Sequence, residues 1–366
     1  MESLLVLNTG SSSVKFRLFS LSPDLPLLAG GKVSDIGGNP VFEAEGKKQS
    51  LKPDITHEKA LDAILDWLGN NAAGNKVAAV AHRIVHAGER YTNPVLLTPE
   101  AMKYLHSLSP LAPLHQPHNL AAVNILSAKK PGLKQYGCFD TAFHARHEKL
   151  FYEFALPGSI RNQGVRRYGF HGLSYDWIAH CLRRNLPSLL PKRVVVAHLG
   201  NGASLCAMKD GKSIDTTMGM TALDGLPMGT RCGSLDPGAL LYILHDLGYS
   251  IEKAEKMLYE DSGLKGLSGI SNDVKTLSES ESTEAKFALD YFILKTAQHI
   301  ATMAVSIGGL DALIFTGGIG ENANDIRLAI ESRLSFLPEF ETHVIPANEE
   351  RIMAQEIWEN FGKDFG

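Results

Sequence analysis

The stretch LLVLNTGSSSVKFRLF, residues 4–19, decides the fold, because it predicts two strands joined by a turn rich in glycine and serine. The same plan returns as RVVVAHLGNGASLCAM at residues 193–208, which begins 189 residues later. In each copy an apolar run leads into a glycine-containing turn, and a second extended run follows. Such a repeat indicates an internal duplication, with one unit in each half of the chain.

The segments around these two copies alternate between helical and extended patterns. Residues His57–Asn70 place apolar side chains on one face of a predicted helix. Further helices are expected near 100–108, 118–129, 174–185, 237–246, 283–308, 321–334 and 348–360, and strands at VAAVAHRIV, YGCFD and DALIFT. Alternation of this kind favours α/β layers. A domain boundary is expected near 143–170, without a low-complexity linker.

Composition narrows the class of protein. The 366 residues carry 40 acidic and 36 basic side chains, a net charge of -4, and no basic block. Nucleic-acid and membrane-surface roles therefore receive little support. The four cysteines are scattered without a CxxC pair, which is typical of a reducing cytoplasm. The most apolar long stretch, 291–309, contains Lys295 and His299 and so favours a buried helix over a membrane span.

Three glycine-rich turns follow predicted strands, at 8–13, 200–204 and 317–322. Glycine lets the backbone approach a ligand closely, so that exposed N–H groups can face phosphate oxygens. The third turn leads into a predicted helix, whose N-terminus favours an anion. None is a Walker motif, and no complete GxGxxG follows a strand. Together the turns predict phosphate binding and leave open a nucleotide-dependent enzyme or an actin-like ATPase.

Nine segments give this pattern a family. They are VLNTGSSSVKF, AHRIVHAGE, LAPLHQPHNL, FDTAFH, RRYGFHG, AHLGNGAS, MGTRCGSLDPG, FTGGIGEN and IPANEE, from residue 5 to about residue 350. In content and order they resemble the acetate kinase family. The resemblance implies an α/β fold of two duplicated actin-like (ribonuclease H-like) domains with the nucleotide cleft between them. Residues 1–145, joined by a C-terminal helix at 350–366, would form one domain. Residues 146–349 would form the other, with the nucleotide loops and a dimer surface.

The implied reaction is the reversible phosphorylation of acetate to acetyl phosphate by direct in-line transfer. ATP and ADP are the co-substrates, and Mg²⁺ (or Mn²⁺) is the expected metal. A carboxylate is already ionised at neutral pH, so it needs no base to become a nucleophile. The difficulty is the approach of one anion to another, which cationic groups would offset.

The resemblance also implies the site residues. Catalytic roles fall to Arg83, Asp140, His171 and Arg231, with Asp140 expected to position a neighbour and not to act as a base. The acyl substrate would meet Arg83, Val85, Leu114, His115, Phe170 and Ala222. The nucleotide would meet Ser11, Ser13, Lys15, His198, Leu199, Gly200, Asn201, Gly202, Asp273, Val274, Lys275, Gly318, Ile319, Gly320, Glu321 and Asn322. Asn8 and Glu349 are the expected metal-associated residues.

Some positions depart from the family pattern. Val274 and Lys275 stand where phenylalanine and arginine are common, although ATP remains the expected nucleotide. Ala222 replaces a usual proline, so we expect propionate to be used appreciably. His144 and His147 are spaced i, i+3 but have no third ligand in register, so we interpret them as residues outside any metal site.

Three alternatives remain at this stage. A propionate or butyrate kinase of the same fold would differ only in pocket volume. A nucleotide switch of the actin or Hsp70 kind would bind ATP without forming an acyl phosphate. A sugar kinase would need Asp140 as a base for a neutral hydroxyl. For an acetate kinase the resemblance further implies a homodimer, through the second domain and its apolar helix at 283–308.

Overall fold

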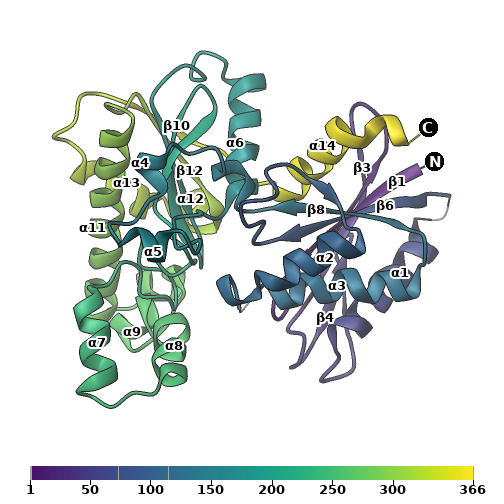
Figure 1. Ribbon diagram of the computed structural model, residues 1–366, viewed down its shortest axis with the longest axis horizontal. Coiled ribbons are helices and arrows are strands. Elements are labelled where there is room, and N and C mark those ends of the chain that lie inside the picture. The colour runs from purple at the N-terminus through teal and green to yellow at the C-terminus, as the bar shows by residue number, and fades with distance from the viewer. Residues whose placement is uncertain (1, 73, 114, 366) are drawn as a thin grey trace. The chain divides into compact units, whose positions relative to one another are not determined.

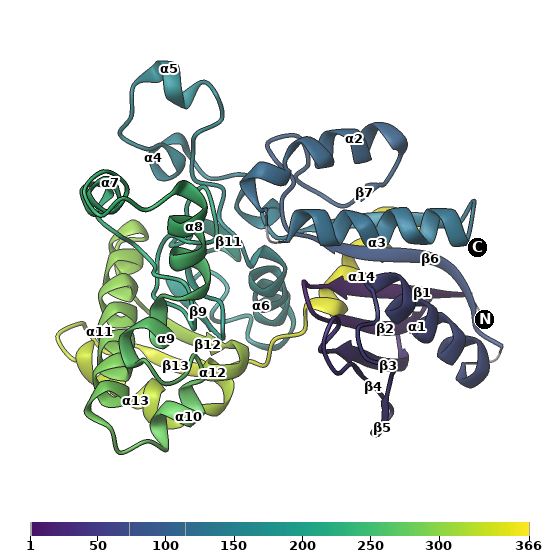
Figure 2. The same cartoon turned by 90° about the horizontal axis from the view of Figure 1, so that it is seen from below.

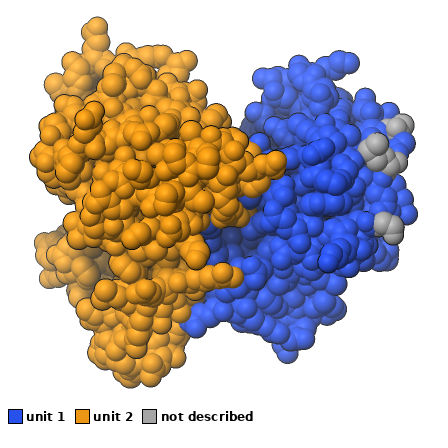
Figure 3. Space-filling view, turned by 90° about the horizontal axis from the view of Figure 1, so that it is seen from above, with its two compact units in different colours: residues 1–143, 348–366 blue, residues 144–347 orange. Residues whose placement is uncertain are grey.

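The computed structural model describes residues 2–72, 74–113 and 115–365. Contacts within the chain divide it into two compact units, coloured blue and orange in Figure 3. Unit 1 comprises residues 1–143 and 348–366, and unit 2 comprises residues 144–347. The C-terminal helix α14 (Glu349–Phe361) therefore packs with the N-terminal half of the chain.

Unit 1 is built on an eight-stranded sheet in the order β5-β4-β3-β2-β1-β6-β8-β7. Its strands are β1 (Glu2–Thr9), β2 (Val14–Ser20), β3 (Leu27–Ser34), β4 (Val41–Ala44), β5 (Lys47–Ser50), β6 (Lys76–Ile84), β7 (Val95–Leu96) and β8 (Lys134–Phe139). Strands β1 to β5 form an antiparallel meander, whereas β6 runs parallel to β1 and β8 runs parallel to β6. Figure 2 shows β6 and β1 to β5 side by side in this order.

Helices cover both faces of this sheet. Helices α1 (His57–Asn71), α2 (Pro99–Ser107) and α3 (Gln116–Lys129) lie on one face, and α14 lies on the other (Figure 1). The alternation of β1 explains this arrangement, because successive side chains of a strand point to opposite faces. Leu5 and Leu7 join a buried cluster with Leu61 and Ile64 of α1.

Unit 2 repeats the same topology around a five-stranded sheet in the order β11-β10-β9-β12-β13. Its strands are β9 (Val194–Leu199), β10 (Ala203–Lys209), β11 (Lys212–Thr216), β12 (Ala312–Thr316) and β13 (Glu341–Val344). Three antiparallel strands are again followed by two parallel ones, as in β3-β2-β1-β6-β8 of unit 1. The internal duplication predicted from residues 4–19 and 193–208 is thus confirmed.

The helices of unit 2 pack around this sheet. They are α4 (Lys149–Tyr152), α5 (Gly158–Arg161), α6 (Gly172–Asn185), α7 (Pro237–His245), α8 (Ile251–Glu260), α9 (Gly263–Ser268), α10 (Val274–Ser278), α11 (Thr283–Ser306), α12 (Gly317–Asn322) and α13 (Asn324–Arg333). Figure 1 shows α6 and α11 on opposite faces of the sheet. The long apolar helix α11 contacts β9, β10 and β11. No helix in the described part of the chain combines the length and apolarity needed to cross a membrane.

One predicted helix is wrong in its continuity. The expected helix at 321–334 is two helices, because α12 ends at Asn322 and α13 begins at Asn324. Ala323 between them has φ -98° and ψ 80°, outside the helical region, and its N–H closes α12 on the carbonyl of Ile319. The third glycine-rich turn therefore forms a short helix of its own.

Buried histidines make the fold sensitive to acid. His82 on β6 is 1% exposed, and its Nε2 lies 2.7 Å from Oε1 of Gln135. Burial lowers the pKa of His82 to about 4, although the bond to Gln135 opposes the shift. Between pH 6.5 and 4 the unfolded chain therefore binds a proton that the folded chain does not, so stability falls as the pH falls.

We expect His82 alone to remove roughly 2 kcal/mol from the free energy of unfolding at pH 5 relative to neutral pH. Urea denaturation of the wild type and of His82→Leu at pH 7 and pH 5 measures this contribution. The variant has no titrating group at this position, so its stability should fall less between the two pH values. An equal fall in both proteins would show that His82 does not take part.

Candidate active site

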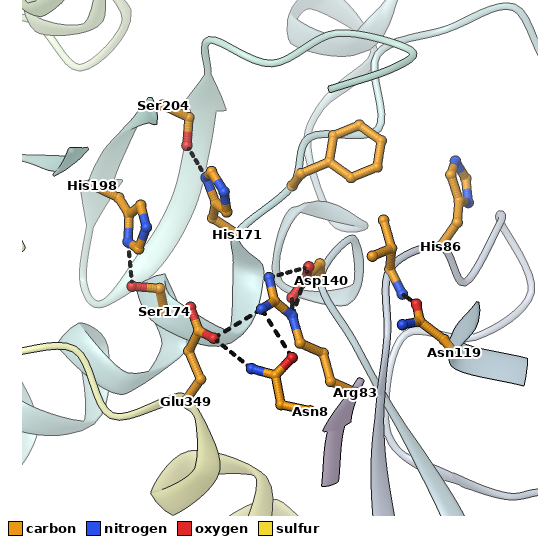
Figure 4. Close-up of polar contacts among 12 residues, drawn as sticks. Asn8, Arg83, His86, Asn119, Asp140, His171, Ser174, His198, Ser204 and Glu349 are labelled. Atoms are coloured by element: carbon orange, nitrogen blue, oxygen red, sulfur yellow. Dashed lines mark hydrogen bonds and ion pairs between the residues drawn. The ribbon is translucent and has the colours of Figure 1, made fainter. Parts of the chain in front are cut away.

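The first polar cluster lies in unit 1, where parallel strands end at one edge of the sheet (Figure 4). Asn8 is near the end of β1, Arg83 near the end of β6, and Asp140 directly after β8. Glu349, the first residue of α14, completes the group. Because β1, β6 and β8 run in the same direction, their carboxyl ends present these side chains together.

Arg83 is the centre of this cluster. Its Nε lies 3.1 Å from both carboxylate oxygens of Asp140, and its Nη2 donates to Oδ2 at 2.8 Å. Its Nη1 donates to Glu349 Oε2 at 3.0 Å and to Asn8 Oδ1 at 3.4 Å. The planar guanidinium can donate several hydrogen bonds at once in fixed directions, and these bonds hold its orientation in addition to pairing its charge.

Burial and charge compete at this ion pair. Burial alone would lower the pKa of Arg83, but the carboxylates of Asp140 and Glu349 outweigh it and raise the pKa above its ordinary value. Burial raises the pKa of Asp140, and the Arg83 guanidinium offsets only part of that increase. Both oxygens of Asp140 accept hydrogen bonds from Arg83, which is the geometry of a residue that orients an arginine.

The oxygens of Asn8 and Glu349 were expected near a metal. Asn8 Nδ2 lies 3.4 Å from Glu349 Oε2, so the two side chains are neighbours. Among the described residues no three His, Cys, Asp or Glu side chains form a group that could hold a metal by themselves. Mg²⁺ keeps several waters and takes one or two protein oxygens together with substrate phosphates. The donor set therefore fits Mg²⁺ bound with a nucleotide, and it does not fit a metal held by protein alone.

Beyond the cluster, β1 and β6 are bridged by an amide that the sequence did not single out. Asn119 of α3 is 3% exposed; its Nδ2 donates to the carbonyl of Thr9 at 2.6 Å and its Oδ1 accepts from Val85 N–H at 3.1 Å. The dashed line at Asn119 in Figure 4 marks the bond that its Oδ1 accepts from a backbone N–H. The buried side chain of Val85 is thus held in place next to the site strands. His115 precedes α3 as its N-cap, and Leu114 lies outside the described residues.

A second cluster lies in unit 2 around a glycine. A Cβ added to Gly202 would lie 3.3 Å from His171 Nε2 and 3.8 Å from Arg231 Nη1. The side chains of His171 and Arg231 therefore both approach the backbone of Gly202. His171 has φ +58°, an uncommon conformation for a residue other than glycine, and it is the N-cap of α6. Its Nδ1 lies 2.8 Å from Ser204 Oγ, which also contacts the hydroxyl of Tyr175.

Arg231 of the same cluster contacts two neutral acceptors. Its Nη1 lies 3.3 Å from the carbonyl of Ala222 and 3.7 Å from the sulfur of Met228. Burial lowers the pKa of Arg231, and the nearby Tyr259 partly opposes that shift. A desolvated guanidinium in such surroundings gains most from an anionic ligand.

Eight of the thirteen predicted nucleotide residues of unit 2 line one pocket. A cavity of about 600 Å³ is lined by Gly200, Asn201, Asp273, Val274, Lys275, Ser278, Gly318, Ile319 and residues 322–326. His198, near the end of β9, lies beside this pocket. A Cβ added to Gly200, which lines the pocket, would be 3.9 Å from His198 Nε2 and 3.9 Å from the backbone nitrogen of Gly318. The His198 ring stacks on that of His171 with centroids 4.4 Å apart, and its Nδ1 lies 2.8 Å from Ser174 Oγ.

Comparison with known proteins decides the family. Residues 3–355 match the model of the Acetokinase family. An acetate kinase of Nitrobacter hamburgensis is 45% identical over 347 residues, which cover 92% of this chain and 86% of that protein. This chain belongs to the Acetokinase family.

Solved structures of acetokinase-family members agree. The Porphyromonas gingivalis acetate kinase matches with a TM-score of 0.87 at 34% identity, over 97% of this chain and 98% of that one. A propionate kinase from Francisella tularensis matches with a TM-score of 0.91 at 35% identity, over 97% and 99%. The actin-like fold implied by the resemblance is confirmed, and the chain is a kinase that transfers a phosphoryl group to a carboxylate.

Other predicted residues of this acetokinase occupy varied surroundings. Glu321 Oε1 accepts from the N–H groups of Gly317 and Ala347, so this carboxylate holds the glycine turn. Asp273 caps α10 by accepting from Thr276. The other predicted residues differ in exposure. Leu199 and Gly320 are buried, Ser13 is half-buried, and Ser11 and Lys15 are exposed. Phe170 is 2% exposed.

Sequence reasoning missed several residues next to these clusters. Ser174 contacts His198 and Ser204 contacts His171. Ser204 is the last residue of the block AHLGNGAS, and Ser174 lies two residues after the block RRYGFHG. Ser278 and residues 323–326 line the pocket because α13 begins beside the glycine turn. The break between α12 and α13, which creates that wall, gave no clear sign in the sequence.

Proposed function

We propose that this protein is an acetate kinase, which forms acetyl phosphate and ADP reversibly from acetate and ATP. The observation that carries the proposal is the convergence of His171 and Arg231 over the Gly202 backbone, in the unit that holds the 600 Å³ pocket. A positive side chain, a ring nitrogen and glycine N–H groups together suit a transferring phosphoryl group. Because the relatives include acetate kinases, we propose acetate as the carboxylate substrate.

The chemistry follows from the charges. A carboxylate oxygen of acetate attacks the γ-phosphorus of ATP, the bond from that phosphorus to the β–γ bridging oxygen breaks, and ADP leaves. No proton has to be removed, so no base is required. Asp140 orients Arg83 for the acyl substrate, while Arg231 and His171 stabilise charge on the transferring group. Val85, Phe170 and Ala222 would line the pocket for the methyl group.

Mg²⁺ (or Mn²⁺) belongs to this proposal. When bound, it would neutralise charge on the nucleotide phosphates. Asn8 and Glu349 would hold it through their oxygens or through its waters, because their donor set suits a hard cation with few protein ligands. Arg83 contacts both side chains and keeps them oriented.

Trapping the acyl phosphate with hydroxylamine tests the function. The purified protein is incubated with ATP, Mg²⁺ and acetate, propionate or butyrate, and the acyl hydroxamate is measured with ferric ion. Hydroxamate formed from acetate and dependent on ATP supports the proposal. If ATP binds but no acid yields hydroxamate, the nucleotide-switch alternative replaces it.

A propionate kinase is the second candidate, favoured by Ala222 and by the match to the Francisella tularensis propionate kinase. One methylene in such a pocket changes the transition-state energy by about 1–3 kcal/mol. We expect kcat/KM for propionate to lie within about 200-fold of that for acetate. Ala222→Pro should lower the propionate-to-acetate ratio. Propionate turnover thousands of times weaker than acetate turnover would refute the widened pocket.

We also propose that the two compact units are the functional domains and that the enzyme is a cytoplasmic homodimer. Helix α7 of unit 2 has no buried residue, and Leu241 and Tyr242 on it are more than half exposed. Ile251 at the start of α8 is 73% exposed. Apolar surface of this kind is typical of a subunit interface.

The four cysteines are unbridged, which suits the cytoplasm. The net charge of -4 does not favour binding to nucleic acid.

A further inference from the structure

Two histidines of unit 2 lie beside the site without a role in the chemistry above. His144 is 2% exposed and His147 is 7% exposed, and their rings meet edge to face with centroids 5.4 Å apart. Such buried imidazoles are costly unless their nitrogens are bonded. Their partners therefore show what they are for.

One serine hydroxyl links these rings. Ser213 Oγ on β11 lies 2.8 Å from His144 Nδ1, 2.6 Å from His147 Nε2 and 3.2 Å from the sulfur of Cys206. On its other side, His144 Nε2 lies 3.0 Å from the carbonyl oxygen of Phe170. The chain of bonds thus runs from His147 through Ser213 and His144 to the backbone of the RRYGFHG segment.

The direction of every bond follows from that carbonyl. A carbonyl oxygen only accepts, so His144 Nε2 must carry the proton. Burial lowers the pKa of His144 to about 4, so at neutral pH its Nδ1 is bare and accepts the hydrogen of Ser213. Because Ser213 has then used its one hydrogen, His147 Nε2 donates to it. The Cys206 thiol has a single hydrogen and lies near two acceptors, Ser213 Oγ at 3.2 Å and the Ala207 carbonyl oxygen at 3.7 Å. The Ser213 hydroxyl thus donates to His144 Nδ1 and accepts from His147 Nε2.

Packing reinforces the bond to Phe170. Gly169 has φ +75°, and a Cβ added there would lie 2.6 Å from His144 Cδ2, so the imidazole covers this glycine directly. The two residues that follow are Phe170 and His171, and His171 itself has φ +58°. The His144 ring is therefore pressed against a backbone in an uncommon conformation, which surrounding contacts must hold.

We propose that His144, which donates from Nε2 to the Phe170 carbonyl and accepts the Ser213 hydroxyl at Nδ1, is a positioning residue that holds the Gly169–His171 segment in its active conformation. The role rests on the proposed function, since Phe170 and His171 are assigned there to the acyl pocket and the phosphoryl group. Loss of the donor at Nε2 frees the Phe170 carbonyl. The side chains of Phe170 and His171 then shift together.

Two substitutions at one position separate donation from packing. The amide nitrogen of glutamine can reach the place of Nε2, so His144→Gln should keep the bond to Phe170 and stay within about threefold of wild type. Asparagine reaches only the place of Nδ1, so His144→Asn should lose about 10- to 100-fold in kcat/KM for acetate. The propionate-to-acetate ratio should also change in His144→Asn. Thr296→Val is the matched control, because its buried hydroxyl has no hydrogen-bond partner among the described residues.

Imidazole ¹⁵N NMR of the full-length protein at pH 7 tests the tautomer independently of activity. Both His144 and His147 should be neutral and protonated at Nε2. In Ser213→Ala, part of the His144 signal should move to the Nδ1–H form, with a severalfold loss of kcat/KM. This variant also serves if His144→Asn does not fold.

Three results would overturn the proposal: an Nδ1–H tautomer for His144 in the wild type, wild-type kinetics in His144→Asn, or equal losses in His144→Asn and His144→Gln. If the wild type forms no acyl phosphate, the proposed function fails and the NMR experiment still decides the tautomer.

Discussion

Arg83→Ala is expected to lower kcat/KM for the carboxylate substrate by about 10³-fold or more and to destabilise unit 1 at the same time. The guanidinium forms ion pairs with the carboxylates of both Asp140 and Glu349. Its removal leaves two poorly solvated carboxylates facing each other, which costs about 3–5 kcal/mol for a buried pair. Activity is expected to fall because the positive charge that would bind the anionic carboxylate substrate is lost.

A second substitution tells these two effects apart. Arg83→Ala combined with Asp140→Ala removes one of the two uncompensated carboxylates, so urea denaturation should show that part of the stability returns. Activity should not return, because the receiving charge is still absent. Arg90→Ala, at an exposed arginine paired with Glu100, should change neither quantity appreciably. Normal turnover by a folded Arg83→Ala protein would refute the role of Arg83.

Arg231→Ala is expected to show a comparable loss of activity, about 10²–10³-fold in kcat, with little loss of stability. Arg231 donates to the carbonyl of Ala222 and to the sulfur of Met228, and burial lowers its pKa. Its charge is therefore costly in the absence of an anion and useful when the phosphoryl group is present.

Steady-state kinetics and thermal unfolding check this contrast. Arg231→Lys keeps a point charge without the fork and should recover only part of the activity. Arg333→Ala, at an exposed position on α13, is the matched control. A Tm that falls as far for Arg231→Ala as for Arg83→Ala would contradict the distinction between the two arginines.

Much of the fold follows from short-range patterns. The two strand–turn–strand copies at β1–β2 and β9–β10 were readable because apolar alternation and glycine turns are local signals. The helices near α1, α3 and α11 were readable for the same reason. Short helices such as α4 and α5 were not, because four residues carry no periodicity. The edge strand β5 is polar and all four of its residues are exposed, so only its pairing with β4 defines it.

The site was predictable only in part. Residue identities came from motif blocks, but the pairing of Arg83 with Asp140 joins residues 57 positions apart through neighbouring parallel strands. Asn119 and Ser213 are harder still, because their importance lies in which backbone or ring they touch. A histidine such as His144 looks like a possible ligand in sequence, and its tautomer depends on a carbonyl 26 residues away.

The central claim is that a carboxylate oxygen of the substrate forms the new bond to the phosphorus that comes from the γ position of ATP. Acetate labelled with ¹⁸O in both carboxyl positions, incubated with ATP, Mg²⁺ and the purified protein, tests this by ³¹P NMR. The account predicts an acyl phosphate resonance with the small upfield shift of an ¹⁸O atom bonded to phosphorus, appearing as ADP appears. ATP consumed to inorganic phosphate alone, or an acyl phosphate without the isotope at phosphorus, would contradict it.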